Sequence, residues 1–350
     1  MKTKVLTVHS QNPEHAVIAE AARVIQSGRL AAFPTETVYG LGANALDAQA
    51  VLRIFAAKGR PSHDPLIVHI ADLGMLEQVA REVPEEARLL AEHFWPGPLT
   101  LILPKHANIP AEVTAGLENV AVRMPAHPVA LALIRAAGLP VAAPSANRFG
   151  HTSPTSAAHV LADLDGRIDM ILDGGSTPIG VESTVLDASQ TPARILRPGG
   201  VSYEALCEVL GNVMINGQKA SHDNLPQLSP GMLSRHYAPR AVMILYESDG
   251  DARVCAEMQE KVTGLLAEGK KVGVICAVED LIYFEGTNAA VRLVGSVEHL
   301  DEIARNLYLA LRDLDATGLD YIVAREFGSQ GIGLAIQDRL RRAATIKEKR

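Results

Sequence analysis

Short apolar runs and amphipathic helical stretches follow one another closely over the first 200 or so residues. Helical spacing of apolar side chains predicts a helix over residues 13–27, with Asn12 as its cap and Pro13 at its first position, and a second helix in AQAVLRIFAAK, capped by Asp47. Strands are predicted at the apolar runs LAAF, LIVHI, LTLILP, NVAVRM, VAAP, MILD, STVLD and RILR. Strands so closely spaced predict an α/β domain with a mixed twisted sheet over residues 1–210.

Residues 211–240 lose this periodicity and collect Asn, Gly, Ser, His and Pro, which is typical of a linker. Beyond them, VMILY, KVGVICA and YIVARE predict strands that alternate with three helices, the second near residues 299–313. Residues 280–295 fit neither pattern. This alternation predicts a small Rossmann-like domain with a parallel sheet over residues 241–350.

Composition narrows the classes of function. The chain has 33 Lys and Arg against 40 Asp and Glu, so no global positive charge attracts nucleic acid, and a polyanion would need a local cationic site. Three widely separated cysteines argue against a zinc site or a disulfide framework. No apolar stretch has the length of a signal peptide core or a membrane span, so we expect a soluble, cytoplasmic protein.

Polar residues cluster in PTETVYGLG, residues 34–42, where a predicted strand ends. Its hydroxyl groups, including that of Thr37, and its glycines suit a ligand-binding loop. An ordinary polar turn with a structural tyrosine explains the motif equally well. The motif alone therefore leaves both interpretations open.

Four cations lie at predicted strand or helix ends: Lys58, Arg60, Arg123 and Arg197. Cations from separate elements could converge on a triphosphate, although a role in surface salt bridges or helix capping stays open. The loop APSANRFGHTSPT, which contains Ser145, suits recognition of a nucleotide or an amino acid. The chain has no G-x-x-x-x-G-K-[ST] or HExxH motif, which argues against a P-loop ATPase and a zinc protease.

The ordered set of motifs resembles the threonylcarbamoyl-AMP synthase family in its long form, a YrdC-like domain followed by a small Rossmann-like domain. The resemblance rests on PTETVYGLG, KGRP with DPL, FWPGPLT, AVRMP, PSAN with SPT, ESTV, LRPG, SPGMLSRHYAP and GIGLAIQDRLRRAA, and it covers nearly the whole chain.

Site residues follow from this resemblance by position. It implies that L-threonine binds at Thr37, His69, Arg123 and Ser183. It implies contacts to ATP from Arg60, Asp64, Ser145, Asn147, Ser153 and Arg197, with His236 and Tyr237 reaching the nucleotide from a linker that closes over the active site. Lys58 and Arg60 are the implied catalytic cations, and no metal ligand is assigned. Asp64 stands where the family commonly has Asn, and a carboxylate there would repel a triphosphate unless it binds Mg²⁺ or faces away.

The activity implied by the resemblance is condensation of L-threonine, bicarbonate or CO₂, and ATP with Mg²⁺ to threonylcarbamoyl-AMP and pyrophosphate. This is a nucleotidyl transfer that needs no protein nucleophile. The implied partner is the downstream tRNA threonylcarbamoyl transferase, with at most weak contact to tRNA itself and no membrane. Two alternatives stay open, an RNA-binding module without catalysis and carbamoyl transfer in hydrogenase maturation. The net negative charge argues against the first, and the lack of Cys-x-x-Cys pairs argues against the second.

Overall fold

The computed structural model describes residues 2–215, 237–248 and 252–349, which form two compact units. The first unit holds the described residues up to 215, except for residues 150–152 and 179–181, which group with the second unit. The predicted domain boundaries stay predictions, since most of the proposed linker lies outside the described residues.

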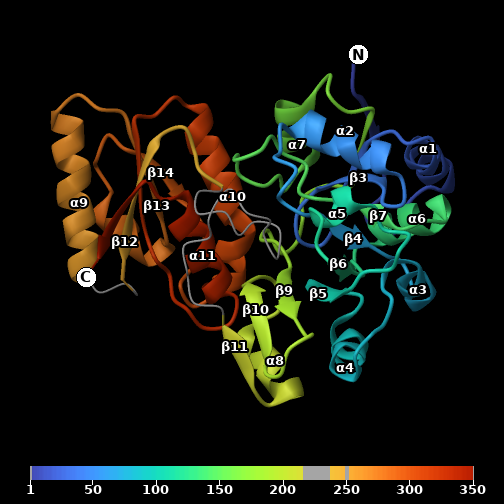
Figure 1. Cartoon of the computed structure of the whole chain (residues 1–350). Coiled ribbons are helices and arrows are strands. Elements are labelled where there is room, and N and C mark those ends of the chain that lie inside the picture. The colour runs from blue at the N-terminus through green and yellow to red at the C-terminus, as the bar shows by residue number, and fades with distance from the viewer. Residues whose placement is uncertain (1, 216–236, 249–251, 350) are drawn as a thin grey trace. The chain divides into compact units, whose positions relative to one another are not determined.

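The first unit contains eight α-helices among its described residues, with one 3₁₀ turn at Leu73–Met75. The helices are α1 (His15–Gln26), α2 (Ala48–Lys58), α3 (Leu76–Val79), α4 (Glu85–Phe94), α5 (Ala111–Thr114), α6 (Pro128–Ala137), α7 (Ala157–Leu164) and α8 (Tyr203–Leu210). Helix α1 packs beside α6, and α2 beside α5 (Figure 1).

An 11-stranded sheet runs through this unit in the order β1-β8-β2-β3-β7-β4-β6-β5-β9-β10-β11. Its strands are β1 (Lys4–Thr7), β2 (Ala31–Phe33), β3 (Gly40–Asn44), β4 (Ile67–His69), β5 (Leu99–Pro104), β6 (Asn119–Arg123), β7 (Val141–Ala142), β8 (Met170–Asp173), β9 (Thr184–Asp187), β10 (Ala193–Arg197) and β11 (Val213–Ile215). Parallel pairs such as β4 with β6 occur beside antiparallel pairs such as β5 with β6. The mixed sheet expected from the strand spacing is confirmed.

The predicted N-terminal cap is confirmed for α2 and is wrong for α1. Asp47 caps α2 as predicted, since its side chain accepts a hydrogen bond from the Gln49 backbone N–H at 2.9 Å. Gly59, at φ +65°, then ends α2 in the left-handed region, which turns the chain sharply after Lys58. The predicted Asn12 cap is wrong, because α1 begins at His15 and Glu14 occupies its N-cap position. The backbone N–H of Asn12 donates to Nδ1 of His9.

Strand β3 was missed because its sequence, GLGAN, has the composition of a turn. A Cβ at Gly42 would lie 2.7 Å from Cε1 of Phe33, on the paired strand β2. The glycine therefore makes room for the buried Phe33 ring. Gly42 of the PTETVYGLG motif thus serves the packing of β3 against β2 within the sheet.

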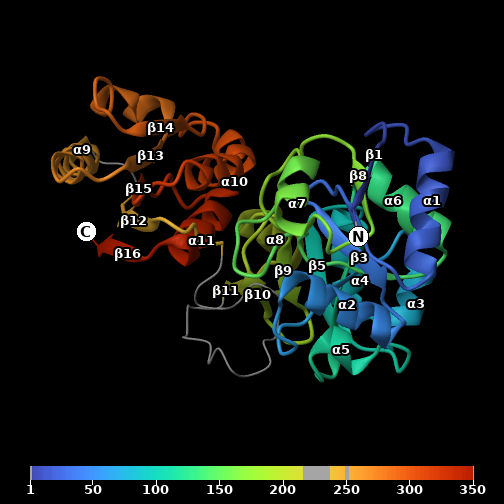
Figure 2. The ribbon, with the colours of Figure 1, turned by 90° about the horizontal axis from the view of Figure 1, so that it is seen from above.

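The second unit is a five-stranded, all-parallel sheet in the order β14-β13-β15-β12-β16, as predicted for its class. Its elements are β12 (Val242–Glu247), α9 (Ala252–Ala267), β13 (Val272–Cys276), a 3₁₀ helix (Val278–Tyr283), β14 (Ala290–Leu293), α10 (Leu300–Ala316), β15 (Tyr321–Arg325), α11 (Gly333–Ala343) and β16 (Ile346–Lys349). Helix α9 covers one face of this sheet, and α10 and α11 cover the other (Figures 1 and 2). Across the described residues, no helix has the length and apolarity needed to cross a membrane.

Candidate active site

Adjacent strands of the first sheet bring several predicted site residues to one end of the sheet. His69 and Arg123 pair at the last positions of the parallel strands β4 and β6. Strand β5 runs antiparallel to β6, so its first residue, Leu99, lies at this end and pairs with Thr184 at the start of β9. Arg197 ends the antiparallel β10 beside the same start of β9.

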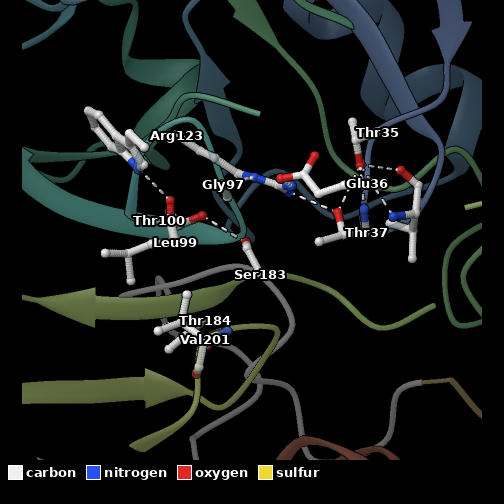
Figure 3. A network of polar contacts seen from close by, with 12 residues as sticks. Thr35, Glu36, Thr37, Gly97, Leu99, Thr100, Arg123, Ser183, Thr184 and Val201 are labelled. Carbon is white, nitrogen blue, oxygen red and sulfur yellow. Dashed lines mark hydrogen bonds and ion pairs between the residues drawn. The ribbon is translucent and has the colours of Figure 1, made fainter. Parts of the chain in front are cut away.

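Arg123 connects this end of the sheet to the PTETVYGLG loop (Figure 3). Its Nη1 donates to Thr37 Oγ1 at 2.9 Å, and its Nε donates to the Gly97 carbonyl at 3.2 Å. Its Nη2 lies 2.5 Å from Oε1 of Glu36. Each of the three side chains, Arg123, Thr37 and Glu36, is less than a tenth exposed, so the charges interact where water screens them little.

His69 lies buried beside this arginine. Its Nδ1 is 3.3 Å from the Ile67 carbonyl, and its ring meets the Phe33 ring edge-on, with the centroids 6.4 Å apart. Burial lowers the pKa of His69 to about 3, and the positive charge of Arg123 acts in the same direction. The ring is therefore neutral at physiological pH, with one nitrogen as a donor and the other as an acceptor.

Lowering the pH is expected to destabilise the first unit in part through His69. The pKa of His69 is lower in the folded state than its usual value of about 6.5, so the contribution of neutral His69 to the free energy of unfolding is fully present above about pH 6.5. That contribution is lost as the pH falls toward the folded-state pKa of about 3. His69→Gln should therefore lose less stability than the wild type between about pH 7.5 and about pH 5 in urea unfolding. The exposed His93→Gln is the matched control and should keep the wild-type pH dependence. Equal pH dependence in all three proteins would contradict the assignment.

Ser183 and Arg197 are in direct contact, although the resemblance assigns them to different substrates. Nη2 of Arg197 donates to the Ser183 carbonyl at 2.9 Å and to its Oγ at 3.2 Å. The Ser183 hydroxyl also shares a 2.8 Å hydrogen bond with Thr100 Oγ1 (Figure 3). A Cβ at Gly199 would lie only 2.2 Å from the Ser183 backbone, so the glycine of LRPG permits this close approach.

Lys58 holds the PSAN loop in place. Its ammonium donates to the backbone carbonyls of Ser145, at 2.5 Å, and Asn147, at 2.6 Å. Within the loop, Ser145 Oγ donates to Asn147 Oδ1 at 2.6 Å, and the Phe149 N–H donates to the Lys58 carbonyl at 2.9 Å. The observed contacts of Lys58 thus position two predicted ATP-binding residues, and its direct action on phosphate stays a prediction.

Arg60 and Asp64 form a buried ion pair, with Nη2 and Oδ2 2.9 Å apart. Nε and Nη2 of Arg60 also donate to the carbonyls of Asp64 and Pro65. Burial raises the pKa of Asp64, against the opposing positive charges of Arg60, Lys58, His63 and Arg197. The carboxylate that would repel a triphosphate is thus paired with Arg60.

The remaining predicted contacts lie in different parts of the chain. Ser153 is buried, and its hydroxyl donates to Glu182 Oε1 at 2.5 Å. Tyr237 is 1% exposed in the second unit, with its ring centroid 5.5 Å from that of Tyr308 and 5.3 Å from the Arg339 guanidinium. His236 lies outside the described residues, and so does most of the proposed lid.

Three polar partners in the site were missed from sequence: Glu36, Thr100 and Glu182. Glu36 lies inside the PTETVYGLG motif and Glu182 inside ESTV, so each carried a signal as a charged member of a noted motif. Thr100 sits within the apolar run LTLILP, where nothing distinguishes it from an ordinary strand threonine. No group of three metal-ligating side chains occurs among the residues that the structure describes.

Comparison with known proteins assigns both halves of the chain. The family described as "Telomere recombination" matches residues 23–199, and the family described as "Threonylcarbamoyl-AMP synthase, C-terminal domain" matches residues 201–345. A threonylcarbamoyl-AMP synthase of Pyrococcus abyssi is 50% identical over 324 residues, which is 93% of each chain. A threonylcarbamoyl-AMP synthase of Bacillus subtilis is 48% identical over 328 residues, which is 93% of this chain and 92% of the relative.

Solved structures agree with these relatives. The structure of P. abyssi Sua5 complexed with L-threonine superposes with a TM-score of 0.92 at 47% identity, covering 99% of this chain and 100% of that chain. A variant of the same protein, with a histidine and a tyrosine replaced by alanine, gives a TM-score of 0.91 at 46% identity over 99% of each chain. The resemblance drawn from the motifs is confirmed, and the chain belongs to the threonylcarbamoyl-AMP synthase family.

Proposed function

We propose that this protein condenses L-threonine, bicarbonate or CO₂, and ATP to threonylcarbamoyl-AMP and pyrophosphate. The observation that carries the proposal is the contact of Ser183 with Arg197, beside the Arg123–Thr37 hydrogen bond at the same sheet end. It joins residues suited to an amino acid with residues suited to a nucleotide. The solved complex of the P. abyssi relative with L-threonine supports the amino-acid half.

On the threonine side, Arg123 would bind the carboxylate and Thr37 and Ser183 would offer hydroxyl groups. His69 would act as a neutral hydrogen-bonding group, because burial lowers its pKa far below physiological pH. Neutrality suits the recognition of a hydroxyl or an amine, since a second cation beside Arg123 would have to be desolvated as well.

On the ATP side, Arg60 and Arg197 would offset charge on the phosphates, with Ser145, Asn147 and Ser153 as polar contacts. Mg²⁺ would enter with ATP as the substrate complex, since Mg²⁺ is commonly held by substrate phosphates and one or two carboxylates. Asp64 lies within electrostatic reach of the proposed phosphate cations, since the charges of Lys58, Arg60 and Arg197 oppose the rise in its pKa. Its pairing with Arg60 keeps this negative charge compensated until a ligand arrives.

The chemistry proceeds by positioning and charge neutralisation. The threonine ammonium loses one proton to give the free amine, the amine adds to carbon dioxide to form the N–C bond, and a second proton leaves to solvent as the carbamate forms. A carbamate oxygen then attacks the α-phosphorus of ATP in line, the bond to the bridging oxygen breaks, and pyrophosphate leaves. Buried cations stabilise charge on the phosphates more strongly than exposed ones would, because less water screens them.

The product is a mixed anhydride that water destroys, so a transferase must consume it promptly. We assign that role to the enzyme that modifies adenosine beside the tRNA anticodon, which makes the reaction a step in tRNA modification. The test supplies isotopically labelled bicarbonate and, separately, ATP labelled in the adenine. A single acid-labile product carrying both labels, formed only with L-threonine, supports the proposal. Formation of labelled ADP, or of AMP that does not depend on L-threonine and bicarbonate, would refute it.

A further inference from the structure

Glu36 is a buried carboxylate to which neither the sequence motifs nor the proposed function gives a role. It lies between Thr35 and Thr37 in the PTETVYGLG loop and is 6% exposed. Its ion-pair partner among the described residues is Arg123, whose Nη2 is 2.5 Å from Oε1 (Figure 3). A charge this deeply buried requires compensation, so its position beside the proposed amino-acid site needs an explanation.

Both members of this pair have unused hydrogen-bonding capacity. Among the described residues, Oε2 of Glu36 accepts no hydrogen bond, and Oε1 and Nη2 of Arg123 meet only as an ion pair whose geometry is not that of a hydrogen bond. The other nitrogens of Arg123 are committed, Nη1 to Thr37 and Nε to Gly97. Buried polar atoms are nearly always satisfied, so Oε2, beside an ion pair with spare capacity on Nη2, marks a place where a ligand supplies the missing partners.

A zwitterionic α-amino acid supplies the required pattern. Its ammonium and carboxylate groups are joined through one carbon, which places the nitrogen about 2.5 Å from the carboxylate carbon. The site offers, side by side, a carboxylate with a free acceptor position on Oε2 and a guanidinium whose Nη2 still has hydrogen-bonding capacity. Resting on the proposed function, we propose that Glu36 binds the ammonium of L-threonine while Arg123 binds its carboxylate, so that the pair selects free α-amino acids.

This arrangement has a consequence for the substrate during turnover. Glu36 accepts hydrogen bonds from the ammonium in the bound amino acid and from the remaining N–H once the carbamate has formed. It therefore acts as a binding residue for the amine in both states. A ligand with a hydroxyl in place of the ammonium keeps the carboxylate contact to Arg123 and loses the charge-assisted bond to Glu36.

The test compares L-threonine with 2,3-dihydroxybutanoate of matching stereochemistry, which replaces the ammonium by a hydroxyl. Calorimetric titration of the full chain should show that Glu36→Gln weakens L-threonine binding about 10- to 100-fold and changes binding of the analogue little. The ratio of the two affinities should therefore fall by the same factor. Glu36→Asp, which keeps the carboxylate on a shorter stem, should recover part of the ratio.

Asp187→Asn is the matched control, since it neutralises another buried carboxylate of the same unit that is bonded to Ser189 and Gln190. Its affinity ratio should equal that of the wild type. If Glu36→Gln weakens the binding of both ligands equally, or changes neither affinity, Glu36 does not bind the amine and the inference is wrong. Failure of the wild type to bind L-threonine would instead overturn the proposed function itself, which keeps the two results distinguishable.

Discussion

Arg123→Lys is expected to lower kcat/KM for L-threonine by about 100- to 1,000-fold, by analogy with the loss of one preorganised donor from a buried site. The guanidinium reaches Thr37, Gly97 and Glu36 at once through three different nitrogens. A lysine ammonium keeps the charge, but it is a single point and cannot span those partners or present a planar fork to a carboxylate. Steady-state pyrophosphate release over a range of threonine concentrations measures the effect.

Arg135→Lys is the matched control for this substitution. Arg135 lies on α6 of the same unit and donates to the backbone carbonyl of Ala71, so lysine there changes the same chemistry away from the site. Its kcat/KM should remain within about twofold of the wild type, as expected for a surface change. Near-normal activity in Arg123→Lys would remove this arginine from the threonine site.

Arg60→Ala is expected to affect both stability and catalysis. It leaves the buried carboxylate of Asp64 without its ion-pair partner, which should lower the free energy of unfolding by about 3–5 kcal/mol. It also removes a cation proposed to neutralise the triphosphate, which should reduce turnover about 100- to 1,000-fold. Urea unfolding and pyrophosphate release measure the two effects separately.

The double variant Arg60→Ala with Asp64→Asn separates the two effects. Once the carboxylate is gone, no unpaired charge remains buried, so most of the lost stability should return. Turnover should stay low, because the cation is still missing. Recovery of both properties together would show that Arg60 serves only to compensate Asp64, and normal turnover in Arg60→Ala alone would contradict its assignment to ATP.

Periodicity predicted the elements whose side chains match their environment. The buried runs LTLILP and NVAVRM became β5 and β6 because nearly every side chain in them is buried, and Asp47 caps α2 because a local hydrogen bond decides that helix start. Strand β3 was missed because its Gly42 is required by the Phe33 ring on the neighbouring strand β2. That contact is tertiary and leaves no local signal in a sequence of turn-like composition.

The site shows the same division. Thr37, Arg123 and Ser183 could be named from motifs. The strand register brings Arg123 and the start of β9, next to Ser183, to one end of the sheet, where Arg123 binds Thr37. The motifs did not predict which residues bind one another. Examples are Lys58 with the carbonyls of the PSAN loop and Arg123 with Glu36. Lys58 and Ser145 are 87 residues apart along the chain, and Glu36 and Arg123 are separated by the same number. Spacing along the chain cannot predict such contacts, because they depend on how the strands are ordered in the sheet.

Pyrophosphate release by the purified chain tests the central claim most directly, with ATP and Mg²⁺ present and L-threonine and bicarbonate omitted in turn from a buffer depleted of carbon dioxide. Release is expected only when both are supplied, because the carbamate that attacks the α-phosphate is assembled from the two. Equal release without either one would contradict that chemistry, and so would a lack of release in the complete mixture.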